Sequence, residues 1–308
     1  MTNRRQFGVF LIVALLVGAG LPAEESSSSW EVAFNIRTAV RAGIMGEHVY
    51  SGDDTISYLE WELLPLVTVG PRIRIQSPWG TTFTGALSLP VTRRTGSMTN
   101  SDYEDPTEPL RRTRVSDHDA LVDSYRSFDV ALSQRLFGVG SGALFAGVGY
   151  RDRFVKMISQ DGTYDYGAAA GDVTGVPITY QQYHRIPYFS VTTRIRTRAD
   201  DTVLASVSVA PYVFVDALDH HHRRLLDFHD TVRGALWVQG ELGISLALWG
   251  RSIEILAFGE LIPETKGDTY TVDYGTNSFE GVTSPTFTDG AGISWWNAGV
   301  AVSVGVGL

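Results

Sequence analysis

Alternating polarity recurs along almost the whole chain and constrains its fold more than any other feature. From Trp30 to Val40 apolar side chains occupy nearly every second position, and Val300 to Leu308 repeats the pattern to the last residue. A period of two residues is typical of a β-strand whose two faces meet different surroundings. Beyond the first 23 residues, no segment has the 3.6-residue period of an amphipathic helix. The chain is therefore predicted to be all-β.

Ten such segments are joined by connections that alternate between short and long. We expect short connections at 69–72, 138–142, 198–201 and 249–252, and long ones at 91–121, 157–177, 217–230 and 263–290. A membrane β-barrel has tight periplasmic turns, longer extracellular loops and an even number of strands, whereas the loops of a soluble β-sandwich are not sorted by length. The sequence thus predicts a ten-stranded antiparallel transmembrane β-barrel with long extracellular loops.

The first residues have the pattern of a secretory signal peptide. Two arginines precede an apolar run from Phe7 to Val17, and Ala19 or Ala23 supplies a small residue for cleavage. We expect residues 1–23 to be removed and 24–308 to form a single outer-membrane barrel domain. The chain has no cysteine, so disulfides do not stabilise it. Its formal net charge of −9 disfavours nucleic acid as a partner.

The stretch Asp219-His220-His221-His222 follows a predicted strand and carries the clearest chemistry. Side chains two apart share a face of a strand, so Asp219 and His221 point one way while His220 and His222 point the other. A carboxylate beside an imidazole is the minimum for an oriented general base. Because the alternation splits the three histidines between two faces, a metal site is not expected.

Other acidic and imidazole groups lie in or beside the predicted long loops. They are Glu47 with His48, the run from Asn100 to Asp105, and Asp117-His118-Asp119. Loops on one rim of a narrow barrel converge across a gap of side-chain dimensions, so these groups can face one another. We expect His118 itself to be a solvated loop residue.

The order and spacing of several stretches resemble the omptin family, the ten-stranded outer-membrane proteases of Gram-negative bacteria. The resemblance is carried by Gly46–Tyr50, Tyr58–Trp61, Gly96–Asp105, Ser127–Asp129, Tyr180–Gln182, Ile186–Tyr188 and Asp219–His221. It implies an endopeptidase whose active-site cleft lies at the extracellular rim and faces the exterior. It also implies contact with lipopolysaccharide, which activity can require, and no other cofactor.

In that family a pair of aspartates faces an Asp–His pair, and a water between them attacks the peptide carbonyl. Asp219 and His221 match the second pair, and Asp102 matches one member of the first; Asn100 stands where the family has aspartate. The resulting hypothesis is that His221 takes a proton from water and Asp219 sets its tautomer. Asp102 would orient the water, and Asn100 would donate a hydrogen bond to the developing oxyanion.

The family holds basic substrate side chains with carboxylates, and this chain matches that set in part. Glu47 corresponds to one of them, but Ala217 stands where another is aspartate. Asp117 and Asp119 are the candidates to replace a third. We therefore expect peptide or protein substrates with basic residues, without a strict dibasic preference.

Two functions of other classes remain open. Asn100 and Ala217 also fit a barrel that has lost its chemistry and serves as an adhesin or binding surface. A small porin is the other, although in a narrow barrel side chains such as Glu60, Glu241 and Arg233 are expected to fill the lumen. The matching positions Glu47, Asp102, Asp219 and His221 favour the enzyme.

Overall fold

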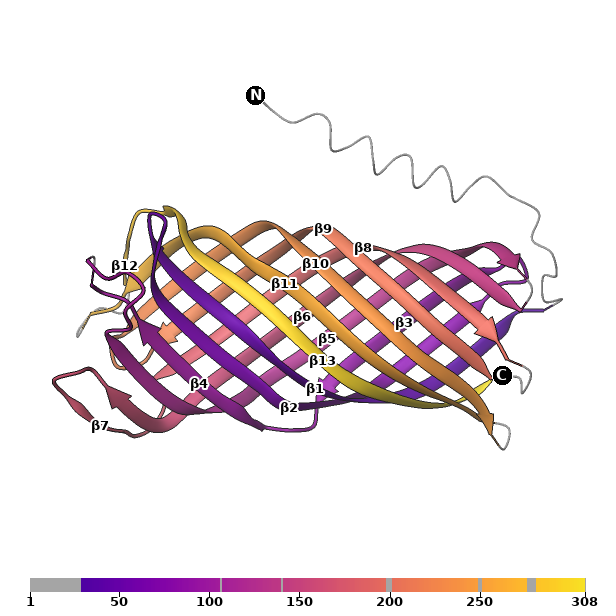
Figure 1. Ribbon diagram of the computed structural model, residues 1–308, viewed down its shortest axis with the longest axis horizontal. Coiled ribbons are helices and arrows are strands. Elements are labelled where there is room, and N and C mark those ends of the chain that lie inside the picture. Colours follow the sequence, from indigo (N-terminus) through magenta and orange to yellow (C-terminus); the bar gives the residue numbers. More distant parts are fainter. Residues whose placement is uncertain are drawn as a thin grey trace, which may run out of the picture.

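The structure is a computed structural model that describes residues 29–105, 107–139, 141–197, 201–248, 251–275 and 281–307. The predicted signal peptide, residues 1–23, lies outside this part of the chain. The thirteen strands of the described residues form one sheet that closes on itself into a long barrel (Figure 1). Within the described residues, no helix is long and apolar enough to cross a membrane.

The strands are β1 (Glu31–Ser51), β2 (Asp54–Gln76), β3 (Thr81–Pro90), β4 (Arg94–Asp102), β5 (Arg114–Val139), β6 (Gly142–Asp165), β7 (Ala170–Val173), β8 (Ile178–Arg196), β9 (Thr202–His221), β10 (Leu226–Leu248), β11 (Arg251–Asp273), β12 (Val282–Thr283) and β13 (Phe287–Gly307). β3 and β4 both pair with β2 and β5, so together they make one interrupted barrel strand. β7 and β12 are short pairs added to β6 and β11. The described ring thus has ten barrel strands, as predicted.

The first and last barrel strands close the ring. β1 pairs antiparallel with β13 from Ala33 opposite Gly307 to Val49 opposite Ala291. Both strands alternate apolar with small or polar residues, so each presents an apolar row to the outside. Closure pairs both edges of each barrel strand in the described part of the chain, which is what a β-structure in a membrane requires.

Two expectations about the connections were wrong. β2 runs through the turn expected at 69–72, and the chain reverses at Ser77–Gly80 instead. Gly70 is needed in the strand, because a Cβ there would lie 1.9 Å from the carbonyl oxygen of Leu87. Much of the four polar segments expected as long loops is also strand. Most residues of these extensions are polar, so their sequence shows little alternation, yet the backbone ladder continues.

Large apolar side chains face outward around the half of the barrel that carries the chain ends. They include Phe34, Ile36, Val40, Phe83, Leu89, Phe128, Leu132, Val148, Val191, Val207, Leu242, Ile255, Val300 and Val302, all exposed. We call this the apolar belt, and the opposite end, where β7 and β12 lie, the loop end (Figure 1). Outward charged pairs such as Arg185–Asp216 lie between the two. The belt marks the membrane-spanning part, and the loop end projects beyond it.

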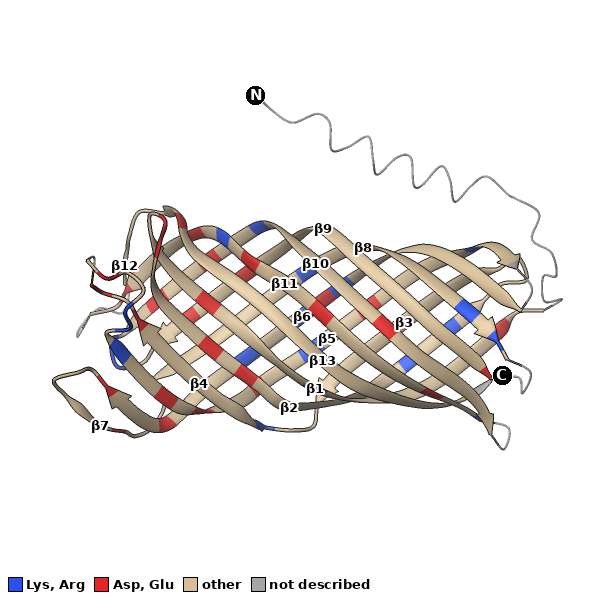
Figure 2. Cartoon of the chain, viewed as in Figure 1, with Lys and Arg blue, Asp and Glu red and all other residues tan. Residues whose placement is uncertain are grey.

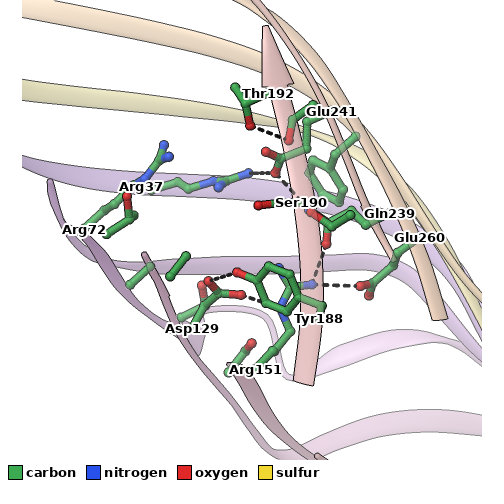
Figure 3. Close-up of a pocket in the computed structure, with 18 of the residues that line it drawn as sticks. Arg37, Arg72, Asp129, Arg151, Tyr188, Ser190, Thr192, Gln239, Glu241 and Glu260 are labelled. Atoms are coloured by element: carbon green, nitrogen blue, oxygen red, sulfur yellow. Dashed lines mark hydrogen bonds and ion pairs between the residues drawn. The ribbon is translucent and has the colours of Figure 1, made fainter. Parts of the chain in front are cut away.

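The lumen within the belt is filled by an ion-paired network (Figure 3). Arg151 contacts Asp129, Gln239 and Glu260 at 2.8, 2.5 and 3.0 Å, and leaves a cavity of only about 150 Å³ nearby. Glu241 lies in this network, as expected. Glu60 and Arg233 were also expected in the lumen, but they lie outside this network. Glu60 is the neighbour of the buried Trp61, and Arg233 is the neighbour of the buried Val232, so both face outward.

A layer of large buried side chains separates this network from the loop end. Trp61, Trp237, Trp295, Tyr180 and Met98 belong to it, and each has an exposed fraction of 0 %. Other residues of the same cluster border the two spaces: Tyr125 and Tyr188 face the lumen network, and Leu59 and Ile178 face the loop-end cleft. The layer gives the cleft a rigid, water-excluding base.

Candidate active site

A cleft of about 610 Å³ opens at the loop end of the barrel. It lies in a region where Asp and Glu are frequent (Figure 2). Residues from β1, β2, β4, β5, β9, β10 and the β9–β10 turn line it, including Glu47, Ser57, Asn100, Asp102, Ser116, His118, Asp219, His221, Arg223, Arg224 and Phe228. All four predicted catalytic residues and Glu47 are thus brought together, although they span 175 positions from Glu47 to His221.

The Asp219–His221 pair has the geometry expected from its spacing. His221 Nε2 lies 2.6 Å from Asp219 Oδ2, and the Asp219 side chain is only 2 % exposed. Tyr180 on β8 and Phe228 on β10 stand directly opposite Asp219 and cover it from both sides. The carboxylate accepts the Nε2 proton, which leaves Nδ1 of His221 as the basic nitrogen. His220 points to the opposite face of β9, and His222 follows the strand; their rings contact each other with centroids 4.3 Å apart.

Asn100 and Asp102 are held together by a serine that the sequence did not single out. The hydroxyl of Ser57 on β2 lies 3.2 Å from Asn100 Oδ1 and 2.8 Å from Asp102 Oδ1. Burial raises the pKa of Asp102 above its usual value, while the Ser57 hydrogen bond and the positive charge of Arg114 oppose that shift. Asp102 and His221 line the cleft from β4 and β9, so they approach it from different walls.

The predicted substrate-binding residues divide into two groups. Glu47 lines the cleft, and Ala217 is buried on the inner face of β9. Asp117 and Asp119 lie elsewhere: Asp117 accepts a hydrogen bond from Thr99, and Asp119 forms an exposed ion pair with Arg94. The inward positions on this part of β5 are taken by Ser116 and His118, because side chains alternate along the strand.

His118 was expected to be solvated, and this was wrong. It is 5 % exposed, lines the cleft and places Nδ1 2.5 Å from the carbonyl oxygen of Asp161. Burial lowers its pKa. The polar segment around it gave no alternation from which an inward position on a strand could be assigned.

Asp230 on β10 is a buried carboxylate near the cleft that sequence reasoning missed. Glu47, Asp219 and Asp230 each have one buried oxygen with no hydrogen-bond partner among the described residues. Burial, followed by repulsion from Asp219 and Asp230, raises the pKa of Glu47 well above its usual value. Burial also raises the pKa of Asp230 to about 7; Asp219 adds to this, and Thr269 opposes it. The three groups form a buried acidic cluster with unmet hydrogen-bonding capacity.

Comparison with known proteins places this geometry in context. The model of the Omptin family matches residues 29–307. No curated protein sequence matches the chain. The crystal structure of the outer membrane protease OmpT from Escherichia coli has a TM-score of 0.82 at 17 % identity, covering 94 % of this chain and 99 % of that one. The translocator domain of the autotransporter NalP from Neisseria meningitidis has a TM-score of only 0.35 at 11 % identity, covering 96 % and 95 %.

The two results bear on different questions. The similarity to the Escherichia coli structure establishes the fold, because the strands superpose although few residues are identical. The family match rests on the sequence itself and extends over nearly the whole described chain. This protein therefore belongs to the omptin family.

Proposed function

We propose that this protein is an outer-membrane endopeptidase that hydrolyses peptide bonds next to basic residues, with its active site facing the exterior. The observation that carries the proposal is the 2.6 Å contact between His221 and Asp219 in the cleft that also holds Asn100 and Asp102. Membership of a family that includes outer-membrane proteases supports the same class of activity.

In the proposed mechanism a water lies between His221 and Asp102. His221 Nδ1 takes one proton from it as the water oxygen attacks the carbonyl carbon, and Asp219 stabilises the imidazolium that forms. Asp102 accepts a hydrogen bond from the O–H that the water keeps, and so fixes the orientation of the attack. His221 then gives its proton to the leaving amine, which completes the hydrolysis.

Asn100 has a separate part in this mechanism. Its Oδ1 faces the Ser57 hydroxyl, so its amide nitrogen is the group left to donate. We assign that donor to the carbonyl oxygen as negative charge develops on it in the transition state. The departure from a second carboxylate at position 100 then changes how the transition state is stabilised without removing the general base.

The buried carboxylate of Glu47 supports the preference for basic residues. Its exposed fraction is 1 % and its Oε2 has no hydrogen-bond partner in the described structure. A cationic side chain supplies both the charge and the donors that this group lacks. We also propose lipopolysaccharide as a partner of the outer wall, where Lys156 and Arg185 lie beyond the apolar belt in partly exposed ion pairs with Asp123 and Asp216.

Cleavage of internally quenched peptides tests the proposal. The protein is refolded in detergent, with and without lipopolysaccharide, and given peptides that contain a single Arg, a single Lys or neither. We expect cleavage beside the basic residue, lost by at least about 1,000-fold in His221→Ala. His220→Ala is the matched control, because His220 pairs with Asp227 on the other face of β9 and should leave the rate unchanged.

The rival functions predict different results. An adhesin or binding barrel gives no cleavage in the correctly folded wild type, and activity that appears only in Asn100→Asp would identify a barrel whose catalysis was lost at that position. A porin requires a conducting lumen, whereas the lumen described here retains a cavity of about 150 Å³ beside its ion-paired network. Conductance in planar bilayers would therefore contradict this structure.

A further inference from the structure

Position 217 carries only a methyl group on the inner face of β9. In the ladder between β9 and β10, Ala217 stands directly opposite Asp230. Both side chains are buried, with exposed fractions of 7 % and 3 %. Opposed residues of antiparallel strands have Cβ atoms about 4.5–5.5 Å apart. Asp230 therefore brings a carboxylate to the space beside Ala217 from the neighbouring strand.

Among the residues that the structure describes, Asp230 has no Lys or Arg as an ion-pair partner. Asp230 Oδ1, Glu47 Oε2 and Asp219 Oδ1 are buried and have no hydrogen-bond partner within the described residues. No Lys or Arg in that part of the chain forms an ion pair with any of the three. A buried carboxylate without a partner is costly, so such a cluster is stable only if it holds protons or receives a cation.

The three carboxylates lie within electrostatic range of one phenol. Their charges all act on the hydroxyl of Tyr180, which stands opposite Asp219 on β8. The Tyr180 ring stacks on Trp61 with centroids 6.0 Å apart and an interplanar angle of 18°. Several buried acidic oxygens without donors suit a cation that donates hydrogen bonds from more than one nitrogen, which describes a guanidinium better than an ammonium.

We propose that Asp230 is a specificity-determining residue: together with Glu47 it binds the single cationic side chain of the substrate, and the pocket prefers arginine to lysine. This rests on the proposed endopeptidase activity and names the carboxylate that replaces the one missing at position 217. Arginine entering the pocket satisfies the free oxygens of both carboxylates. It also displaces the protons that they otherwise hold, so binding releases protons to solution.

The test compares quenched peptides that differ only at one position, with arginine, lysine or the uncharged isostere citrulline. We expect Asp230→Asn to lower kcat/KM for the arginine peptide by about 10- to 100-fold, mostly through KM, and to leave the citrulline peptide unchanged. Asp227→Asn is the matched control, since Asp227 lies three residues away on the outer face of β10 and pairs with His220. Ala217→Asp added to Asp230→Asn should restore much of the arginine preference.

The rescue separates a charge effect from a folding defect, because a purely structural role for Asp230 is not restored by a carboxylate on β9. An unchanged ratio of arginine to citrulline cleavage in Asp230→Asn would overturn the proposal. The proposal would also be overturned if Asp230→Asn lowered kcat/KM equally for both peptides and Ala217→Asp did not restore it. If wild type cleaves nothing, the proposed activity fails, and the pocket is tested alone by binding of the arginine peptide to His221→Ala with and without Asp230→Asn. Equal affinities of the two proteins for the arginine peptide would then reject the proposed role of Asp230.

Discussion

A carboxylate placed at position 100 tests whether Asp102 acts alone or as part of a pair. Ser57 Oγ lies 3.2 Å from Asn100 Oδ1 and 2.8 Å from Asp102 Oδ1, and it has one proton to donate. The two acceptor oxygens are therefore no further apart than 3.2 Å plus 2.8 Å, about 6 Å. Asn100→Asp introduces a second negative charge within that distance.

The repulsion follows from Coulomb's law. Two unit charges about 6 Å apart repel by about 2.8 kcal/mol at an effective dielectric constant of about 20, and by about 0.7 kcal/mol in water. The cleft is open to solvent, so the value lies between these limits. It corresponds to an upward pKa shift of about 0.5–2 units for the pair. Burial already raises the pKa of Asp102, so the pair in Asn100→Asp holds a shared proton closer to neutral pH.

Rate and stability measurements both report this shift. The acidic limb of kcat/KM between pH 4.5 and 9 should move upward by about 0.5–2 units in Asn100→Asp. An acid whose folded pKa is raised loses stability as pH rises from its unfolded pKa through the folded one. The variant should therefore be destabilised relative to wild type by about 1–3 kcal/mol at pH 8 and hardly at all at pH 4.

Asn100→Ala is the control, because it removes the acceptor of Ser57 without adding charge, and its acidic limb should not move upward. Coincident limbs in wild type and Asn100→Asp, with equal stability at pH 4 and pH 8, would refute the reasoning. That result would mean that the two side chains are not held together by Ser57, or that Asp102 need not be ionised for attack.

Three further predictions follow from the charges of the barrel. Glu260→Gln removes the counter-charge of the buried Arg153 and should lower the free energy of unfolding in detergent by about 3–5 kcal/mol, and unchanged stability would contradict the network described here. Arg223 and Arg224 line the cleft, so a peptide with a glutamate beside its arginine should be cleaved with a higher kcat/KM at low salt. The substitution Arg224→Ser should reduce this advantage. Salt at 0.5 M, where the Debye length is about 4 Å, should reduce it as well. The pKa of Asp230 is about 7. If its ionised form binds the cation as proposed, kcat/KM for arginine peptides should rise through about pH 7, and the same rise in Asp230→Asn would show that another group is responsible.

The fold class was predictable because a membrane barrel places unlike surroundings on the two faces of each strand. Lipid outside and a polar lumen inside require alternation, and alternation is visible in the sequence. The prediction failed where that contrast ends. β4 and the first part of β5 lie beyond the apolar belt and carry mostly polar residues, so they were expected as loop. Gly70 was expected in a turn, but in β2 it permits a close approach to Leu87.

The candidate site was predictable only in its local part. Asp219 and His221 are two residues apart on one strand, so their shared face and their hydrogen bond followed from strand geometry alone. Ser57 and His118 gave no such signal, because their roles depend on neighbours from other strands. Asp117 and Asp119 are carboxylates, as a pocket for basic side chains requires, but they lie on the face of β5 that points away from the cleft.

The sequence by itself therefore determined the barrel and the Asp219–His221 pair, since both depend on a period of two along a single strand. Which carboxylates share the cleft was decided only by the tertiary structure. Asp230 stands opposite Ala217 because the β9–β10 turn fixes the register of the two strands. A shift of that register by one residue turns every following side chain to the other face, and nothing in the local pattern of β10 reveals which register the chain adopts.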